Sequence, residues 1–215
     1  MKLNVYFFLV VFFVSATEIT QGQAPKAVNQ PATGIATMFA RDPITQTFCF
    51  EDGDFGSTIQ NGQVLNRCSN LSYNAYNADA FTVGIEGGRE GVILDLGTTQ
   101  DLKSRYSYLD SVGFGQGFAS IDVRNGEGVI VQDFRKGTRQ ELKEATQLFQ
   151  APKSAASASV KLGHIYLIRV TDPKDKAYEV LGKMLVLAYV PGESVTIRWQ
   201  LLGEAQNASV SKPSR

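Results

Sequence analysis

A short acidic segment is the first place where this sequence could do chemistry. Glu51, Asp52 and Asp54 surround Gly53. Carboxylate oxygens grouped around a glycine turn are ligands that suit calcium. The spacing does not continue to a glutamate at the twelfth position, so the segment is not an EF-hand loop. A solvated turn explains the same residues without an ion, so a calcium site and an ordinary turn both stay open.

Tyrosines and asparagines that follow this segment have the chemistry of a ligand-binding surface. Tyr73, Asn74 and Tyr76 lie within four consecutive residues. Aromatic rings stack on the C–H faces of sugars, and amides hydrogen-bond sugar hydroxyls. We predict that these three residues contact a ligand such as a glycan. Loops of ordinary β proteins also contain Asn and Tyr, which leaves a purely structural role as the alternative.

Groups suited to catalysis are scattered along the chain. A glycoside hydrolase needs two facing carboxyl groups, and the candidates by residue type are Asp95, Asp101, Asp110, Asp122 and Asp133. His164 is the only histidine, so any Ser–His or Cys–His mechanism must use it. The glycine-rich segment 113–118 lacks the Lys-Ser/Thr pair of a phosphate loop. We therefore expect a protein without a catalytic site, with a carboxylate-pair hydrolase as the alternative.

The N-terminus predicts export. Lys2 precedes an apolar run of ten residues, 5–14, which is followed by small residues. This pattern is typical of a signal peptide, here residues 1–24 with cleavage after Ala16 or Ala24. Ten apolar residues are too few to span a bilayer, which needs about 20. We expect a secreted or otherwise extracytoplasmic protein with no membrane span after cleavage.

The two cysteines agree with that compartment. Cys49 and Cys68 are the only ones, and an oxidising environment favours a disulfide between them. Two cysteines and one remote histidine cannot complete a tetrahedral metal site without carboxylates. We expect no cofactor other than the calcium considered above. Asn70 and Asn207 open Asn-x-Ser triplets that could carry a glycan in a eukaryote.

Composition excludes several classes of protein. The 215 residues carry 21 Lys and Arg against 21 Asp and Glu, a formal net charge of zero. A nucleic-acid-binding protein would need a basic surface, so nucleic acid is not an expected partner. Twenty Gly, thirteen Phe and eight Tyr favour a β-rich fold. We expect a flexible lead-in over 25–33, one β-rich domain over 34–203 and a polar tail over 204–215.

Local patterns then predict the elements. Alternating or continuous apolar runs predict strands at 34–40, 47–50, 80–85, 92–96, 106–112, 118–123, 129–134, 165–170, 178–190 and 195–201. Glycines in 86–91 and Asn125-Gly126 predict hairpin turns, and the last three strands predict an antiparallel meander with Trp199 in the core. Segment 57–80 is expected to be a surface loop, and 151–159 a connector. A helix is predicted over 139–149, with Thr138 and Glu141 at capping-box spacing.

These elements lead to one fold class and a ranked set of functions. We predict an all-β, mainly antiparallel fold, a β-sandwich or jelly roll with one short peripheral helix near 139–149. The leading functional hypothesis is a secreted, non-catalytic domain that binds an extracellular glycan or surface protein through segment 51–76. The alternatives are a carbohydrate-active hydrolase and a structural envelope or matrix protein whose edge strands pair between chains.

Overall fold

The structure, a computed structural model, describes residues 33–85, 88–106, 116–124, 128–133, 137–150 and 155–202. It is built mostly of antiparallel strands in a sandwich-like arrangement, which confirms the predicted fold class. The predicted signal peptide and C-terminal tail, nearly all of the lead-in, Asp110 and Asn207 lie outside the described residues. No helix within the described ranges is long and apolar enough to cross a membrane.

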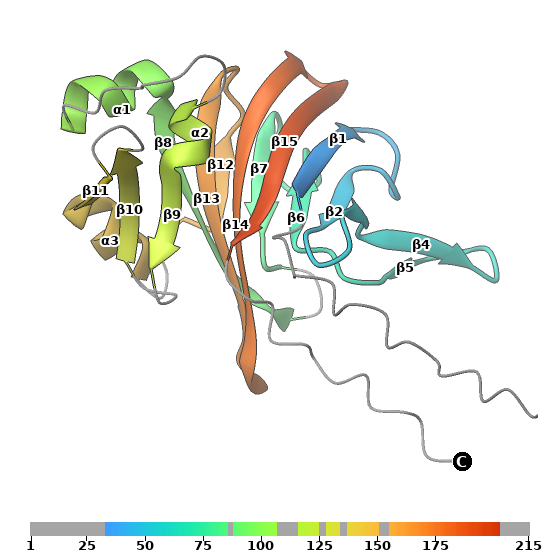
Figure 1. Cartoon of the computed structure of the whole chain (residues 1–215). Coiled ribbons are helices and arrows are strands. Elements are labelled where there is room, and N and C mark those ends of the chain that lie inside the picture. The colour runs from blue at the N-terminus through green and yellow to red at the C-terminus, as the bar shows by residue number, and fades with distance from the viewer. Residues whose placement is uncertain are drawn as a thin grey trace, which may run out of the picture.

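A five-stranded antiparallel sheet forms the middle layer (Figure 1). Its strands, in spatial order, are β1 (Thr33–Phe39), β15 (Ser194–Leu202), β14 (Asp175–Val190), β13 (His164–Asp172) and β8 (Glu90–Thr98). Strands β13, β14 and β15 are consecutive neighbours, so the predicted meander is confirmed. The single strand predicted over 178–190 is confirmed as the 16-residue strand β14, which continues through Gly182.

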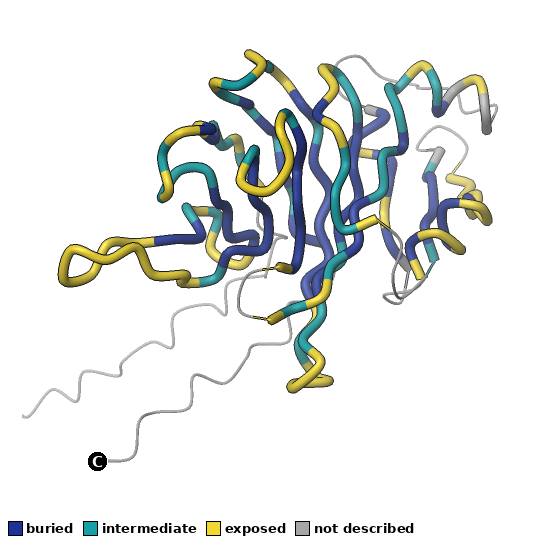
Figure 2. The backbone as a smooth tube through the Cα atoms, turned by 180° about the vertical axis from the view of Figure 1, so that it is seen from behind, coloured by how far each residue is buried: buried dark blue, intermediate teal, exposed yellow. Residues whose placement is uncertain are grey.

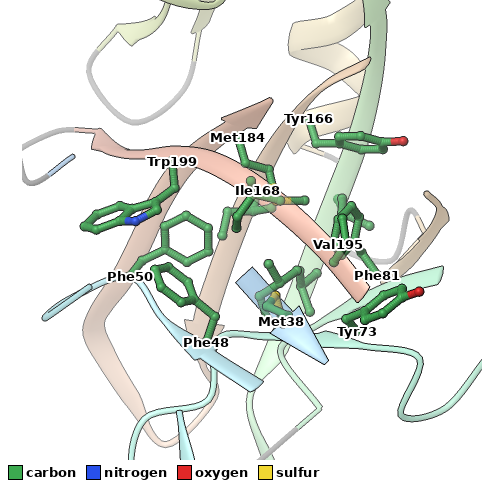
Figure 3. Packing of buried hydrophobic residues seen from close by; sticks show 14 of the residues in the cluster. Met38, Phe48, Phe50, Tyr73, Phe81, Tyr166, Ile168, Met184, Val195 and Trp199 are labelled. Atoms are coloured by element: carbon green, nitrogen blue, oxygen red, sulfur yellow. The ribbon is translucent and has the colours of Figure 1, made fainter. Parts of the chain in front are cut away.

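A second sheet packs on one face of this layer. It consists of β12 (Ser157–Ser159), β7 (Ala80–Val83), β6 (Leu71–Tyr73), β2 (Thr47–Cys49) and β3 (Asp54–Phe55). The core between the two sheets is aromatic, as Figure 3 shows. Trp199 is only 5% exposed and lies against Phe48 and Phe50, with ring centroids 5.3 and 6.0 Å away. The predicted core position of Trp199 is confirmed.

The opposite face of the middle sheet is covered by a mixed layer (Figure 1). This layer contains α1 (Thr99–Tyr106), α2 (Gln116–Ser120), β9 (Ile121–Arg124), β10 (Gly128–Asp133), β11 (Thr138–Glu141) and α3 (Lys143–Gln150). Its apolar side chains form a second core with one face of β13 and β14. Burial on both faces is the reason why β14 has a near-continuous apolar sequence.

Segment 57–80 is not the surface loop that its composition predicts. It contains a two-stranded ribbon, β4 (Ser57–Gln60) and β5 (Gln63–Asn66), followed by the inner strand β6. The predicted hairpin between 80–85 and 92–96 is also wrong, because β7 and β8 belong to different sheets. Their chains cross closely at Gly84 and Gly91, where an added Cβ on Gly84 would lie 2.3 Å from the Gly91 nitrogen.

The described residues contain three helices where one was predicted. Residues 139–141 belong to β11, which pairs with β10, and α3 starts only at Lys143, so the predicted capping box is wrong. Of the strand predicted at 106–112, Tyr106 belongs to α1 and the other residues lie outside the described ranges. Of the strand predicted at 118–123, residues 118–120 belong to α2 and 121–123 to β9. The pairing of β9 with β10 confirms the hairpin predicted around Asn125-Gly126. The predicted connector at 151–159 includes the short strand β12.

Candidate functional site

The ribbon β4–β5 projects from the second sheet as an arm (Figures 1 and 2). Its turn residues Asn61 and Gly62 have φ of 52° and 76°, the two positive values of a type I′ turn. Ile59 lies opposite Val64 in the ladder, and these side chains are 59% and 46% exposed. Residues 57–66 include no charged residue. Natural edge strands usually carry charges that prevent pairing with other chains, so this arm is unusually open to a partner.

The base of the arm is held by covalent and hydrogen bonds. Cys49 and Cys68 form the predicted disulfide, with their Cα atoms 5.4 Å apart. The backbone N–H groups of Arg67 and Cys68 both donate to the carbonyl of Gly56, at 2.8 and 3.0 Å. An isolated two-stranded hairpin is marginal in water. The disulfide and these hydrogen bonds therefore stabilise the base of an arm that would be only marginally stable by itself.

Acidic residues surround that base, but their carboxylates face different partners. The Arg67 guanidinium donates to Asp52, with Nη1 2.5 Å from Oδ2. Asp54 is 3.9 Å from the same guanidinium and has a side chain 69% exposed. Glu51 instead turns toward the disulfide. The predicted calcium ligands are thus not gathered around one point, and calcium binding stays a prediction.

Glu51 lies against both sulfur atoms. Its Oε2 is 3.3 Å from the Sγ of Cys49 and 3.0 Å from that of Cys68. The Tyr178 hydroxyl lies near Glu51 and accepts a 3.0 Å hydrogen bond from Asn70 Nδ2. Burial, followed by the charge of Glu51, raises the pKa of Tyr178 far above its ordinary value. Glu51 therefore has the disulfide and a buried tyrosine as its neighbours.

The predicted ligand-binding residues are separated by the fold. Tyr73 is fully buried in β6 next to Phe81, with ring centroids 6.2 Å apart, so its ring offers no face to a sugar. Its role is corrected to that of a core residue, and its burial raises the pKa of the phenol. Asn74 has φ of 58° and accepts from the backbone N–H of Asp79 at 2.7 Å. Tyr76 is 48% exposed. Binding at Asn74 and Tyr76 stays a prediction.

Asn70 is used inside the molecule. It is 1% exposed, its Oδ1 accepts from the Phe50 backbone at 2.8 Å, and its Nδ2 donates to Tyr178. In the folded chain this side chain is not presented to a glycosylating enzyme.

Three of the candidate catalytic carboxylates have a local structural partner among the described residues. Asp95 accepts from His164 Nδ1 at 2.8 Å and from Lys161 Nζ at 3.1 Å. Burial opposes ionisation of Asp95, but hydrogen bonds from His164, the Gly97 N–H and Lys161 outweigh it and lower the pKa of Asp95. Asp101 caps the start of α1 by accepting from the Thr98 N–H and hydroxyl. Asp122 is exposed and accepts from the next backbone N–H; the side chain of Asp133 lies outside the description.

A hollow of about 180 Å³ lies between β8, β13 and the end of α3. It is lined by Glu90, Gly91, Val92, Phe149, Gln150, Arg169 and Thr171. Pockets for small molecules usually have volumes of roughly 300 to 1,000 Å³. In the hollow, Arg169 Nε donates a 2.7 Å hydrogen bond to Glu179 Oε1. The hollow therefore offers a substrate little room, and its arginine is already paired.

Two features of the site were missed from sequence. Asn61-Gly62 is the same hairpin signal as Asn125-Gly126, and it could have identified the arm. The approach of Glu51 to the sulfurs has no local sequence signal, because it depends on how the chain folds at the base of the arm. No family model, curated protein or solved structure matches the chain.

Proposed function

We propose that this protein is a non-catalytic binding domain that acts outside the cytoplasm, and that the β4–β5 arm binds another protein. One observation carries the proposal. Ten consecutive residues without charge form a projecting ribbon, and Ile59, Val64 and Leu65 on it are 59%, 46% and 39% exposed. Apolar, uncharged surface of this kind is what protein interfaces bury.

A second hairpin in the same chain provides the comparison. Strands β13 and β14 also end in a turn with exposed residues, but that turn carries Asp172, Lys174, Asp175 and Lys176. Charges of this kind keep exposed strands from pairing with other chains. Their absence from the arm supports a binding role for the arm, and their presence makes the other hairpin a matched control.

The chemistry of the arm favours a protein over a glycan. Residues 57–66 contain aliphatic, amide and hydroxyl side chains, and neither an aromatic ring nor a charge. Sugar-binding sites usually stack rings on the sugar. A protein could instead cover Ile59 and Val64 and pair an extended strand with the outer edge of β4 or β5. The disulfide and the predicted signal peptide support a location outside the cytoplasm.

Site-specific photocrosslinking tests the proposal. A photoreactive amino acid replaces Val64 in the arm or Lys174 in the control hairpin, and the protein is expressed in its source cells and irradiated. We expect a discrete adduct from position 64 and none from position 174. A further Ile59→Lys substitution should remove the adduct without changing the circular dichroism spectrum, since Ile59 is exposed. Equal adducts from both positions, or none from the arm, would overturn the proposal. An adduct of twice the chain mass would identify a second copy as the partner.

A further inference from the structure

The geometry points to a metal site at the base of the arm: in the reduced protein, Cys49, Cys68 and Glu51 bind a soft divalent cation such as Zn²⁺. Within the described residues, these three form a group whose ligand atoms all lie within 4.8 Å of one another. The sequence argued against a metal site because the two cysteines lack a carboxylate ligand. In the structure, Glu51 supplies that carboxylate. This inference does not depend on the proposed binding function.

Glu51 lies where it could act as a ligand once the disulfide is reduced. A bonded sulfur has no proton to donate, so it offers an anionic oxygen at 3.0 to 3.3 Å no hydrogen bond. Two thiols could donate to that oxygen, and a cation between the three atoms would satisfy all of them. The position of Glu51 therefore allows its carboxylate to act as a third ligand once the pair is reduced.

The surroundings of Glu51 resemble the outer shell of a metal site. Metal-binding carboxylates are themselves oriented by hydrogen bonds. Here the Tyr178 hydroxyl lies near Glu51, and Asn70 donates to that hydroxyl at 3.0 Å. Arg89 stacks on the Tyr178 ring, 4.0 Å from its centroid, and further fixes the ring. The supporting groups thus come from three separate segments of the chain.

The ligand types select the metal. Thiolates favour zinc and similar soft ions, whereas calcium takes oxygen ligands alone. Two sulfurs and one carboxylate leave the fourth tetrahedral position to water, as in zinc sites that are not closed. Cys49 is buried, Cys68 is partly exposed and Glu51 is exposed, so an ion can enter from the side of Glu51.

The chemical steps balance with a thiol reductant as the co-reactant. Two molecules of the thiol reduce the Cys49–Cys68 bond by exchange, and they leave as their own disulfide while both cysteines gain a proton. Zn²⁺ then displaces two protons and forms two Zn–S bonds, with Glu51 as the third ligand. Either bond, disulfide or metal–thiolate, connects β2 to the end of β5.

Cobalt titration of the full chain without oxygen tests the inference. We expect the protein reduced with a phosphine to bind one Co²⁺ with a thiolate-to-cobalt absorption band, and Zn²⁺ to displace it. The oxidised protein should show no band. Glu51→Gln should weaken cobalt binding more than tenfold, and Tyr178→Phe by about 10 to 100-fold. Asp52→Asn is the matched control, because Asp52 faces Arg67. The Asp52→Asn protein should bind cobalt like the unaltered protein.

Folding is followed in the same samples by circular dichroism. Zn²⁺ should raise the melting temperature of the reduced protein and leave that of reduced Glu51→Gln almost unchanged. Absence of a thiolate band in the reduced protein would overturn the inference. So would cobalt binding that is equally tight in Glu51→Gln, since thiols in an unfolded chain bind without the carboxylate.

Discussion

Lys183 is a charged residue that the fold buries, with only 2% of it exposed. Its Nζ donates to the Ile121 carbonyl at 2.5 Å and lies 3.4 Å from the Ala119 carbonyl, both at the end of α2. Backbone carbonyls at a helix end lack partners within the helix. Lys183 therefore connects the middle sheet to the layer above it through hydrogen bonds to backbone carbonyls where α2 meets β9. Burial lowers its pKa to about 8, helped by Arg198 and opposed by Asp122.

This lowered pKa makes stability depend on alkaline pH. Between pH 8 and the ordinary lysine value of 10.5 the unfolded chain binds more protons than the folded one, so the free energy of unfolding rises with pH. We expect a rise of about 2 kcal/mol from pH 8 to pH 9.5 in denaturant titrations. Above pH 10 the raised pKa values of Tyr166, Tyr178 and Tyr189 act in the opposite direction, because the unfolded tyrosines ionise first.

Lys183→Met should remove this rise. Lys161→Met is the control, because Lys161 has an exposed side chain and should keep the slope of the unaltered protein. A Lys183→Met protein whose stability still increases by about 2 kcal/mol over this interval would show that another group is responsible.

At the scale of the element, two turns show what glycine does in the acidic segment and in the arm. Gly53 has φ of +73°, and a Cβ there would lie 2.5 Å from the Trp199 ring. Gly62 has φ of +76°, but a Cβ there would meet nothing within 4 Å. The first turn is thus constrained by backbone conformation and by packing, and the second by conformation alone.

Alanine substitutions separate these two constraints. Gly62→Ala should cost about 1 to 2 kcal/mol of unfolding free energy, the strain of a left-handed residue. Gly53→Ala should cost roughly 2 to 5 kcal/mol, because overpacking against Trp199 adds about 1 to 3 kcal/mol. Urea unfolding followed by Trp199 fluorescence measures both. Equal losses in the two variants would mean that the ring of Trp199 moves aside freely.

Hydrophobic periodicity predicted the strands whose burial pattern is regular. It failed where contacts between distant segments determine the secondary structure or the strand pairing. Strands β13 to β15 alternate or run apolar over their whole length, so the meander was predictable. Segment 138–141 fits both a helix cap and an edge strand, and pairing with β10 selects the strand. Strands β7 and β8 follow each other in sequence yet join different sheets, a choice that no local pattern encodes.

The candidate site was predictable only in part, for the same reason. The cysteine pair followed from composition and the predicted compartment, and the structure confirms it. The approach of Glu51 to the sulfurs depends on how the disulfide joins two segments, and the burial of Tyr73 depends on β6 being an inner strand of the second sheet. Both are consequences of tertiary packing, so residue types alone could not reveal them.

On the scale of the whole molecule, one sheet serves two cores. Adjacent residues of β13 illustrate this arrangement: Leu167 belongs to the core under the mixed layer, and Ile168 to the aromatic core beneath the second sheet. Both side chains are fully buried. Since β13 to β15 contribute to both cores, loss of packing on one face should destabilise the strands on which the other face depends.

We therefore expect the described layers to unfold together. Leu167→Ala and Ile168→Ala should each lower the free energy of unfolding by about 2 to 5 kcal/mol. Trp199 is the only tryptophan and lies in the aromatic core, whereas Leu167 belongs to the other core. Trp199 fluorescence therefore reports on the core to which Leu167 does not contribute. In Leu167→Ala the fluorescence midpoint in urea should fall together with the far-ultraviolet circular dichroism midpoint. A Leu167→Ala protein in which the dichroism midpoint falls but the Trp199 midpoint stays unchanged would instead mean that the mixed layer unfolds on its own, and that the two cores are energetically separate despite their shared strands.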